Sequence, residues 1–165
     1  MSAIYLPEGM PGPRGNPGPY APRHFARAYR VAAVTLSATP NTYSDLIFDT
    51  VAAGENPESL YSTVTGSYTC PEQGLYLVLC QVSFQLVGTN MSCALRFKKN
   101  GSDYTLANVM VPTNNATVPL TVALIPCAAN DLLGPPRIAS SMASATLRVN
   151  AAVEMYQSIC FLGGL

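Results

Sequence analysis

The 165-residue chain has little charge, a single histidine and no long apolar segment. Charged residues make up 11% of the sequence, and nine basic residues balance nine acidic ones. An ordinary soluble domain carries roughly 25% charged residues, so this chain must expose much neutral or apolar surface, which usually marks interfaces. The zero net charge disfavours nucleic acid and anionic membranes as partners. No run of about 18 apolar residues occurs, which excludes a membrane-spanning helix.

The N-terminus also lacks the marks of a secreted protein. Residues 1–6 have neither the basic region nor the apolar region of a signal peptide. Five scattered cysteines, an odd number without C-x-x-C spacing, leave at least one unpaired within a chain. We interpret them as small buried residues in strands, with disulfides or metal ligation as alternatives. The lack of signal-peptide features in residues 1–6 predicts folding in the cytoplasm of the producing cell.

A glycine repeat dominates the first 20 residues. Four consecutive Gly-x-y triplets begin at Gly9, Gly12, Gly15 and Gly18, and each contains proline. A triple helix of polyproline-II strands has room on its axis only for glycine, once every third residue. The repeat therefore predicts either collagen-like trimeric packing or an extended arm along a neighbour. We interpret residues 1–27 as an anchoring arm and residues 28–165 as one domain.

Four arginines form the one concentration of like charge: Arg14, Arg23, Arg27 and Arg30. They could serve solubility, or they could dock the arm onto an acidic surface of another subunit. Nucleic acid is disfavoured, because few aromatic residues stand among them to stack on bases. The residues assigned to arm anchoring are Gly9, Gly12, Arg14, Gly15, Gly18, Arg23 and Arg27.

Short strand-like segments separated by turn residues fill the rest of the chain. The expected strands are 28–36, 46–51, 67–69, 74–87, 91–98, 102–111, 117–125, 131–138, 145–157 and 159–162. Turn signals include 54–57, 88–90, 113–115 and 134–136, and Asn100-Gly101 suits a two-residue type I′ hairpin turn. No segment shows a helical apolar period. The pattern predicts an all-β sandwich or jelly roll.

The segment 75–87 is apolar on both faces over part of its length. Successive side chains of a strand point to opposite faces. One face carries Tyr76, Val78, Cys80, Val82, Phe84 and Leu86. The other begins with Leu75, Leu77 and Leu79 and continues with Gln81, Ser83 and Gln85. A sandwich supplies only one partner sheet, so the second apolar face predicts a neighbouring subunit or a covering loop.

Chemistry-bearing residues are too sparse for a recognisable catalytic site. Nucleophilic triads need a histidine, and the only one, His24, stands at the junction of arm and domain. Asp45 and Asp49 are four residues apart, which is a weak basis for paired carboxylates. A calcium-assisted site at Asp49, Asp103 or Asp131 is the alternative to solvated loop carboxylates. We therefore expect no enzyme, no cofactor and no metal.

Residues 48–51 and 61–76 resemble the globular domain of the C1q and tumour necrosis factor superfamily. The most specific stretch is Gly66-Ser67-Tyr68-Thr69-Cys70-Pro71-Glu72-Gln73-Gly74-Leu75-Tyr76, which is similar to the family's Gly-x-aromatic-x-Cys-Pro-x-x-Gly-x-Tyr pattern. The resemblance implies a ten-stranded jelly roll that forms homotrimers and binds rather than catalyses. It further implies that Tyr76, Phe84 and Phe161 lie in the core or at the trimer interface. We assign Leu86 and Tyr156 to the same set.

Together these features predict a virion structural protein. We expect a homotrimeric C1q-like module that decorates or cements a capsid, or forms a head fibre, with the arm anchored on the major capsid protein. The alternative is an extracellular C1q-like module that recognises a ligand through residues 54–61 and 114–117. The Asn-x-Ser/Thr sequons at Asn90, Asn100 and Asn115 would matter only in that second setting.

Overall fold

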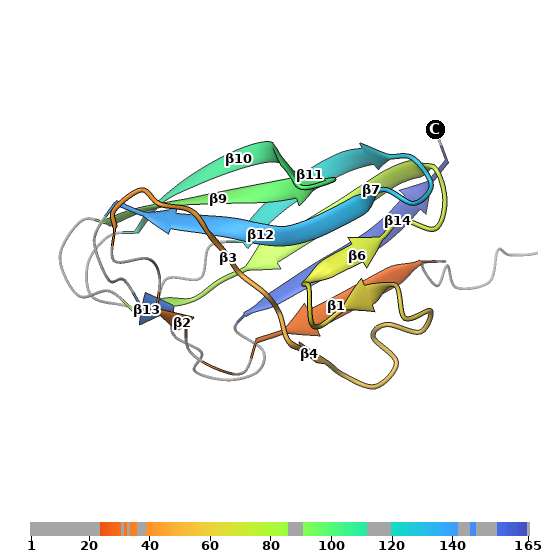
Figure 1. Cartoon of the computed structure of the whole chain (residues 1–165), viewed down its shortest axis with the longest axis horizontal. Coiled ribbons are helices and arrows are strands. Elements are labelled where there is room, and N and C mark those ends of the chain that lie inside the picture. Colours follow the sequence, from red (N-terminus) through yellow and green to blue (C-terminus); the bar gives the residue numbers. More distant parts are fainter. Residues whose placement is uncertain are drawn as a thin grey trace, which may run out of the picture.

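The computed structural model describes residues 24–30, 32, 34–35, 39–85, 91–111, 120–141, 146–147 and 155–164. Every regular element in these ranges is a strand, and all the pairings are antiparallel (Figure 1). None of the described residues forms a helix that could cross a membrane. The arm residues 1–23 lie outside the described residues, so their predicted role stays a prediction.

Two sheets make up the sandwich. The five-stranded sheet has the order β11-β7-β14-β1-β4 and contains β1 (Phe25–Tyr29), β4 (Thr50–Val51), β7 (Gly74–Gln81), β11 (Leu120–Cys127) and β14 (Tyr156–Gly163). The six-stranded sheet has the order β10-β9-β12-β6-β5, with β3 also paired to β12. Its strands are β3 (Ser44–Asp45), β5 (Tyr61–Ser62), β6 (Ser67–Thr69), β9 (Met91–Lys99), β10 (Ser102–Val111) and β12 (Leu132–Ser140).

A third, smaller sheet closes one end of the sandwich. It joins β2 (Val34–Thr35), β13 (Thr146–Leu147) and β8 (Phe84–Gln85) in the order β2-β13-β8. In Figure 1 this sheet lies at the left, away from the end at which β14 finishes. The predicted all-β jelly-roll class is confirmed.

The core lies between the two large sheets. Strand β7 alternates strictly between buried and half-buried residues, as its apolar period predicts. Tyr76 and Val78 point inward from β7 and are 0% and 1% exposed. The other large, fully buried side chains are Leu46, Phe48, Tyr68, Phe97, Ile125, Leu133, Ile138 and Met155. The C1q-like stretch therefore supplies two core aromatics, Tyr68 and Tyr76, whose rings meet edge to face at 6.1 Å.

The hairpin between β9 and β10 has the predicted turn. Asn100 and Gly101 have φ angles of 50° and 80°, the two positive values that a type I′ turn requires. Asn100 also ties the hairpin to β12, because its Oδ1 accepts a hydrogen bond of 2.8 Å from the Leu132 amide. Asparagine thus serves both the backbone conformation and the contact with the next strand.

Two predictions about where strands end were wrong. The segment 74–87 is not one strand: β7 ends at Gln81, and after Val82 and Ser83 the chain enters the small sheet as β8. The expected turn at 134–136 lies inside β12, where the pairing with β9 shifts register between Gly134 and Arg137. Proline is tolerated at such a bulge because no ladder hydrogen bond from its nitrogen is needed there.

The C-terminal strand and the first strand also differ from expectation. β14 runs without a break through Ser158, which pairs with Leu79 and Arg27. β1 begins at Phe25, so residues 25–27, which the sequence interpretation counted with the arm, lie in the five-stranded sheet. The expected strand 28–36 is represented by the end of β1 and by β2.

Candidate interaction surface

The outer face of the five-stranded sheet is apolar. In β7 the outward side chains of Leu75, Leu77 and Leu79 are half-buried. In the neighbouring edge strand β11 the outward side chains are Leu120, Val122 and Leu124, which are 54%, 53% and 54% exposed. Natural edge strands usually carry charges or other features that prevent association, and residues 120–127 contain no charged residue.

The strand register gathers these side chains into rows. Cross-strand partners in an antiparallel pair share a face. Leu77 is paired with Leu124 on one side and with Cys160 on the other. Leu79 is paired with Val122 and Ser158 in the same way. The exposed Leu162 lies on the same strand as Cys160. The rows join three strands into one surface of leucine, valine and other uncharged side chains, which we call the apolar face.

One arginine interrupts the apolar face. Arg27 on β1 points outward, and its guanidinium carbon lies 4.4 Å from the centre of the Tyr156 ring and 5.2 Å from that of Tyr29. Its amide donates to the Glu55 carbonyl at 2.8 Å, and the two side chains approach to 4.0 Å. Arg27 Nε and Glu55 Oε2 are buried without a hydrogen-bond partner among the described residues. Arg27 is therefore fixed on the sheet rather than extended with an arm.

Burial raises the pKa of Tyr29, and a hydrogen bond to Glu55 adds to the effect. The phenol of Tyr29 therefore stays neutral beside the carboxylate at ordinary pH. The charged groups at this point of the apolar face are therefore the Arg27 guanidinium and the Glu55 carboxylate, which we call the Arg27 site.

The five residues assigned to the core or the interface fall in different places. Tyr76 is a core residue, and Tyr156 lies on the apolar face. Phe161 lies at the border of the core, with its ring 5.2 Å from that of Tyr76. Phe84 belongs to β8, where its backbone pairs with Leu147. The side chain of Phe84, the whole of Leu86, the arm residues up to Arg23 and the loop 114–117 lie outside the described residues.

His24 has partners that the sequence did not suggest. Its Nδ1 lies 2.5 Å from Glu58 Oε2, and its Nε2 lies 2.5 Å from Glu72 Oε1. The ring packs on Phe161 at 5.6 Å, and its backbone carbonyl accepts a hydrogen bond from the Phe161 amide. Burial lowers the pKa of His24, but the hydrogen bonds and charges of the two carboxylates outweigh it and raise the pKa above 6.5.

This arrangement does not form a nucleophilic triad, because both ring nitrogens bond carboxylates and neither is bonded to a hydroxyl or a thiol. It holds the start of β1 against two loops that are 34 and 48 residues away in the sequence. No local pattern predicts contacts over such distances, which is why the sequence interpretation gave His24 only a generic role.

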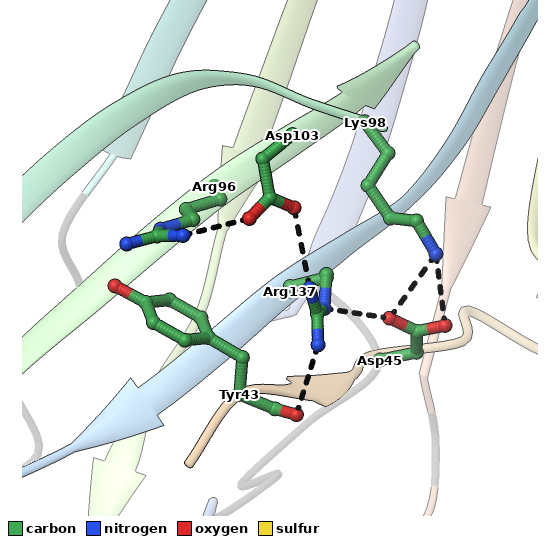
Figure 2. A network of polar contacts seen from close by, with 6 residues as sticks. All are labelled: Tyr43, Asp45, Arg96, Lys98, Asp103 and Arg137. Atoms are coloured by element: carbon green, nitrogen blue, oxygen red, sulfur yellow. Dashed lines mark hydrogen bonds and ion pairs between the residues drawn. The ribbon is translucent and has the colours of Figure 1, made fainter. Parts of the chain in front are cut away.

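The outer face of the six-stranded sheet carries charge instead. Figure 2 shows Arg137 between Asp103 and Asp45, at 3.4 and 3.3 Å, with its guanidinium also donating to the Tyr43 carbonyl at 3.4 Å. Arg96 donates to Asp103 at 2.7 Å. Lys98 completes the network by donating to Asp45 at 3.1 Å. These six residues come from β3, the residue before it, β9, β10 and β12, and we call them the charged network.

Stacking and charge pairing shape this network. The guanidinium of Arg96 lies 4.0 Å from the centre of the Tyr43 ring. The hydrogen bond from Arg96, followed by that from Arg137, lowers the pKa of Asp103 below its usual value. Asp103 therefore stays ionised over the physiological pH range.

The carboxylates considered for calcium are paired with cations. Asp49 lies 3.6 Å from Arg30, and Asp131 lies 3.0 Å from Lys99. Hydrogen bonds from Asn100, the Ala128 amide and Lys99 lower the pKa of Asp131 to about 2. The described part of the chain contains no group of three or more His, Cys, Asp or Glu side chains that could hold a metal ion.

Comparisons with known proteins find similarity in structure alone. No protein-family model and no curated protein matches the sequence. Among solved structures, the Eiger TNF of S. frugiperda has a TM-score of 0.62 and 12% identity, over 87% of this chain and 96% of that one. Murine APRIL has a TM-score of 0.59 and 14% identity, over 84% and 98% of the two chains.

The globular domain of zebrafish complement 1qA has a TM-score of 0.55 and 11% identity, over 86% of this chain and 98% of that one. Identities this low show the fold and leave ligands and partners open. A fold by itself does not assign a function. The chain has the TNF/C1q-like jelly-roll fold.

Proposed function

We propose that this chain is a non-enzymatic structural protein that works as a homotrimer, with the apolar face as its subunit interface. The observation that carries the proposal is the absence of charge along β7 and β11 on that face, next to a composition with only 11% charged residues. Exposed apolar surface of this extent usually marks an interface. The occupant that we propose is a second and a third copy of the same chain.

Two independent features support identical copies as the occupants. Gly-x-y triplets at residues 9–20 are typical of chains that pack in threes. The resemblance of residues 66–76 to the C1q and tumour necrosis factor superfamily implies homotrimers as well.

The solution mass of the full-length chain tests this proposal. Light scattering coupled to size exclusion should give three times 17.5 kDa, about 52.5 kDa. A 17.5 kDa species across the micromolar range would contradict it, since an interface built from this face would then be too weak to assemble the protein.

We further propose that the trimer decorates or cements a viral capsid and is anchored by residues 1–23, the part of the predicted arm that precedes the first described residue. Three linked arms would act together, because binding of the first arm raises the effective concentration of the other two. A trimer would thereby convert three weak contacts into one firm attachment. The low content of charged residues, 11%, supports a role in which neighbouring chains cover much of the surface.

Truncation separates anchoring from assembly. A variant lacking residues 1–20 should remain a folded trimer by mass but should no longer sediment with virus particles from the native source. Full-length protein should sediment at a fixed ratio to the major capsid protein. Sedimentation of the truncated trimer at the same ratio would rule out the arm as the anchor. Glycans on Asn90, Asn100 or Asn115 of native protein would favour the extracellular role instead.

A further inference from the structure

Two cysteines meet at the end of the sandwich where β14 finishes. Cys70 follows β6, and Cys127 is the last residue of β11. The backbone holds them together: the Cys70 amide donates to the Asp131 carbonyl at 2.9 Å, and the Asn130 amide donates to the Cys70 carbonyl at 2.7 Å. Both side chains belong to the same buried core cluster, and each thiol shifts the pKa of the other. No other pair of cysteines among the described side chains is joined in this way.

A surface cavity lies beside one of the two cysteines. The cavity has a volume of about 330 Å³ and is lined by Gln73, Lys99, Pro126, Cys127, Ala128 and Asp131. Cys127 is 3% exposed and lies in its wall. Cys70 is fully buried and does not line it. A small molecule in the cavity would therefore reach Cys127 first.

The electrostatic environment also makes Cys127 the more reactive of the two thiols, because the two pKa values are shifted in opposite directions. The hydrogen bond from Cys70 lowers the pKa of Cys127, and the positive charge of Lys99 adds to this, against burial and the charge of Asp131. Lys99 is held in place by bonds of 2.6 Å to the Pro126 carbonyl and 3.0 Å to Asp131. The hydrogen bond to Cys127, followed by burial, raises the pKa of Cys70. Since the thiolate is the nucleophile, Cys127 is the attacking group.

We propose that Cys70 and Cys127 form a redox-sensitive pair, which closes to a disulfide by exchange with a low-molecular-weight disulfide such as oxidised glutathione. Cys127 Sγ attacks one sulfur of the small disulfide, which forms a mixed disulfide and releases one small thiol. Cys70 Sγ then attacks Cys127 Sγ and releases the second small thiol. The two protein thiols are oxidised, the small disulfide is reduced, and the two protons end on the two small thiols.

The disulfide would link the turn before β7 to the end of β11. Closing a long loop restricts the unfolded chain, so the oxidised protein should unfold at a temperature several degrees higher than the reduced protein. The number of chains in the assembled protein should not change. Both sulfur atoms belong to one chain and lie away from the apolar face.

Peptide mapping of the folded full-length protein tests the pair. Native protein is incubated with oxidised glutathione, its remaining thiols are alkylated, and it is digested with chymotrypsin, which cuts between Cys70 and Cys80 at Tyr76. The expected product is a peptide joined through Cys70 and Cys127, with the loss of two free thiols per chain and full reversal by dithiothreitol. The same digest reports on Cys93, whose side chain lies outside the described residues.

Serine variants assign the two roles. C70S should stop at a glutathione adduct on Cys127, and C127S should give neither adduct nor cross-link. C160S is the matched control and should cross-link as the unaltered protein does, because Cys160 lies on the other side of its sheet. Five free thiols that persist in folded wild-type protein, or a disulfide through any other cysteine, would overturn the proposal even if a serine variant fails to fold.

Discussion

The two outer faces of this sandwich are built in the same way and expose opposite chemistry. On the five-stranded sheet, outward positions of β7 and β11 are Leu77, Leu79, Val122 and similar residues. On the six-stranded sheet, outward positions of β9 and β12 include Arg96 and Arg137, which are opposite each other in the register. Both faces lie over one shared core. Under our proposal, partner chains cover the apolar face, whereas the charged face remains in water.

The largest effect should come from placing a charge on the apolar face. Val122→Asp adds a carboxylate at an exposed position, so the single chain should still fold. Burial of that unpaired charge in an interface would cost several kcal/mol, and the mass by light scattering should fall from about 52.5 kDa to 17.5 kDa.

Val64→Asp is the matched control for this substitution. Val64 is 83% exposed and lies in the turn between β5 and β6, away from the apolar face. Its replacement should leave the mass unchanged. If both variants remained trimers, the apolar face would not be the interface, and the contrast between the two faces would lose its functional meaning.

The apolar face is also where the sequence is most informative. Period-two alternation is a local property, so the sequence by itself assigns Leu75, Leu77 and Leu79 to a second apolar surface. Leu120, Val122 and Leu124 join this surface only because β11 pairs with β7. That pairing cannot be predicted from the sequence of either strand alone.

The charged network shows more clearly which contacts the sequence cannot predict. Asp45, Arg96 and Arg137 come from strands far apart in the chain and meet only because β12 lies between β9 and β3. The residues Pro135 and Pro136 predict a turn but lie at a bulge within β12, because proline and glycine are typical of both features. Contacts that depend on sheet order therefore cannot be predicted from the sequence, whereas the alternation within one strand can.

A smaller effect is expected from cutting the charged network at its centre. Arg137→Met keeps part of the aliphatic stem but removes the cation that joins Asp45 and Asp103. Partly exposed ion pairs contribute little, so the free energy of unfolding should fall by about 1 kcal/mol. Urea denaturation would measure this, and the mass should remain that of the trimer.

Arg27→Met is the comparison on the opposite face. It also removes a guanidinium, but one that is packed between Tyr29 and Tyr156 on the apolar face. Under our proposal it should change the concentration at which trimers dissociate, which Arg137→Met should not do. Equal effects of both substitutions on assembly would show that the two faces are not functionally distinct.

The smallest effect should come from pH, through the ion pairs that the half-buried His24 makes at the start of β1. His24 donates to Glu58 and Glu72 at the same time, which requires both ring nitrogens to be protonated. Because its pKa is raised above 6.5 in the folded chain, its contribution to stability is fully present below pH 6.5 and is lost as pH rises through the raised pKa.

Proton NMR can follow this directly, since His24 is the only histidine in the chain. Its ring resonance should titrate above pH 6.5, and the melting temperature should decline slightly over the same interval. Glu58→Gln with Glu72→Gln removes both carboxylates and should return the titration to 6.5 or lower, because burial is then unopposed. A wild-type His24 that titrates at or below 6.5 would mean that the carboxylates do not hold the ring, and the start of β1 would then depend on its pairing with β14 alone.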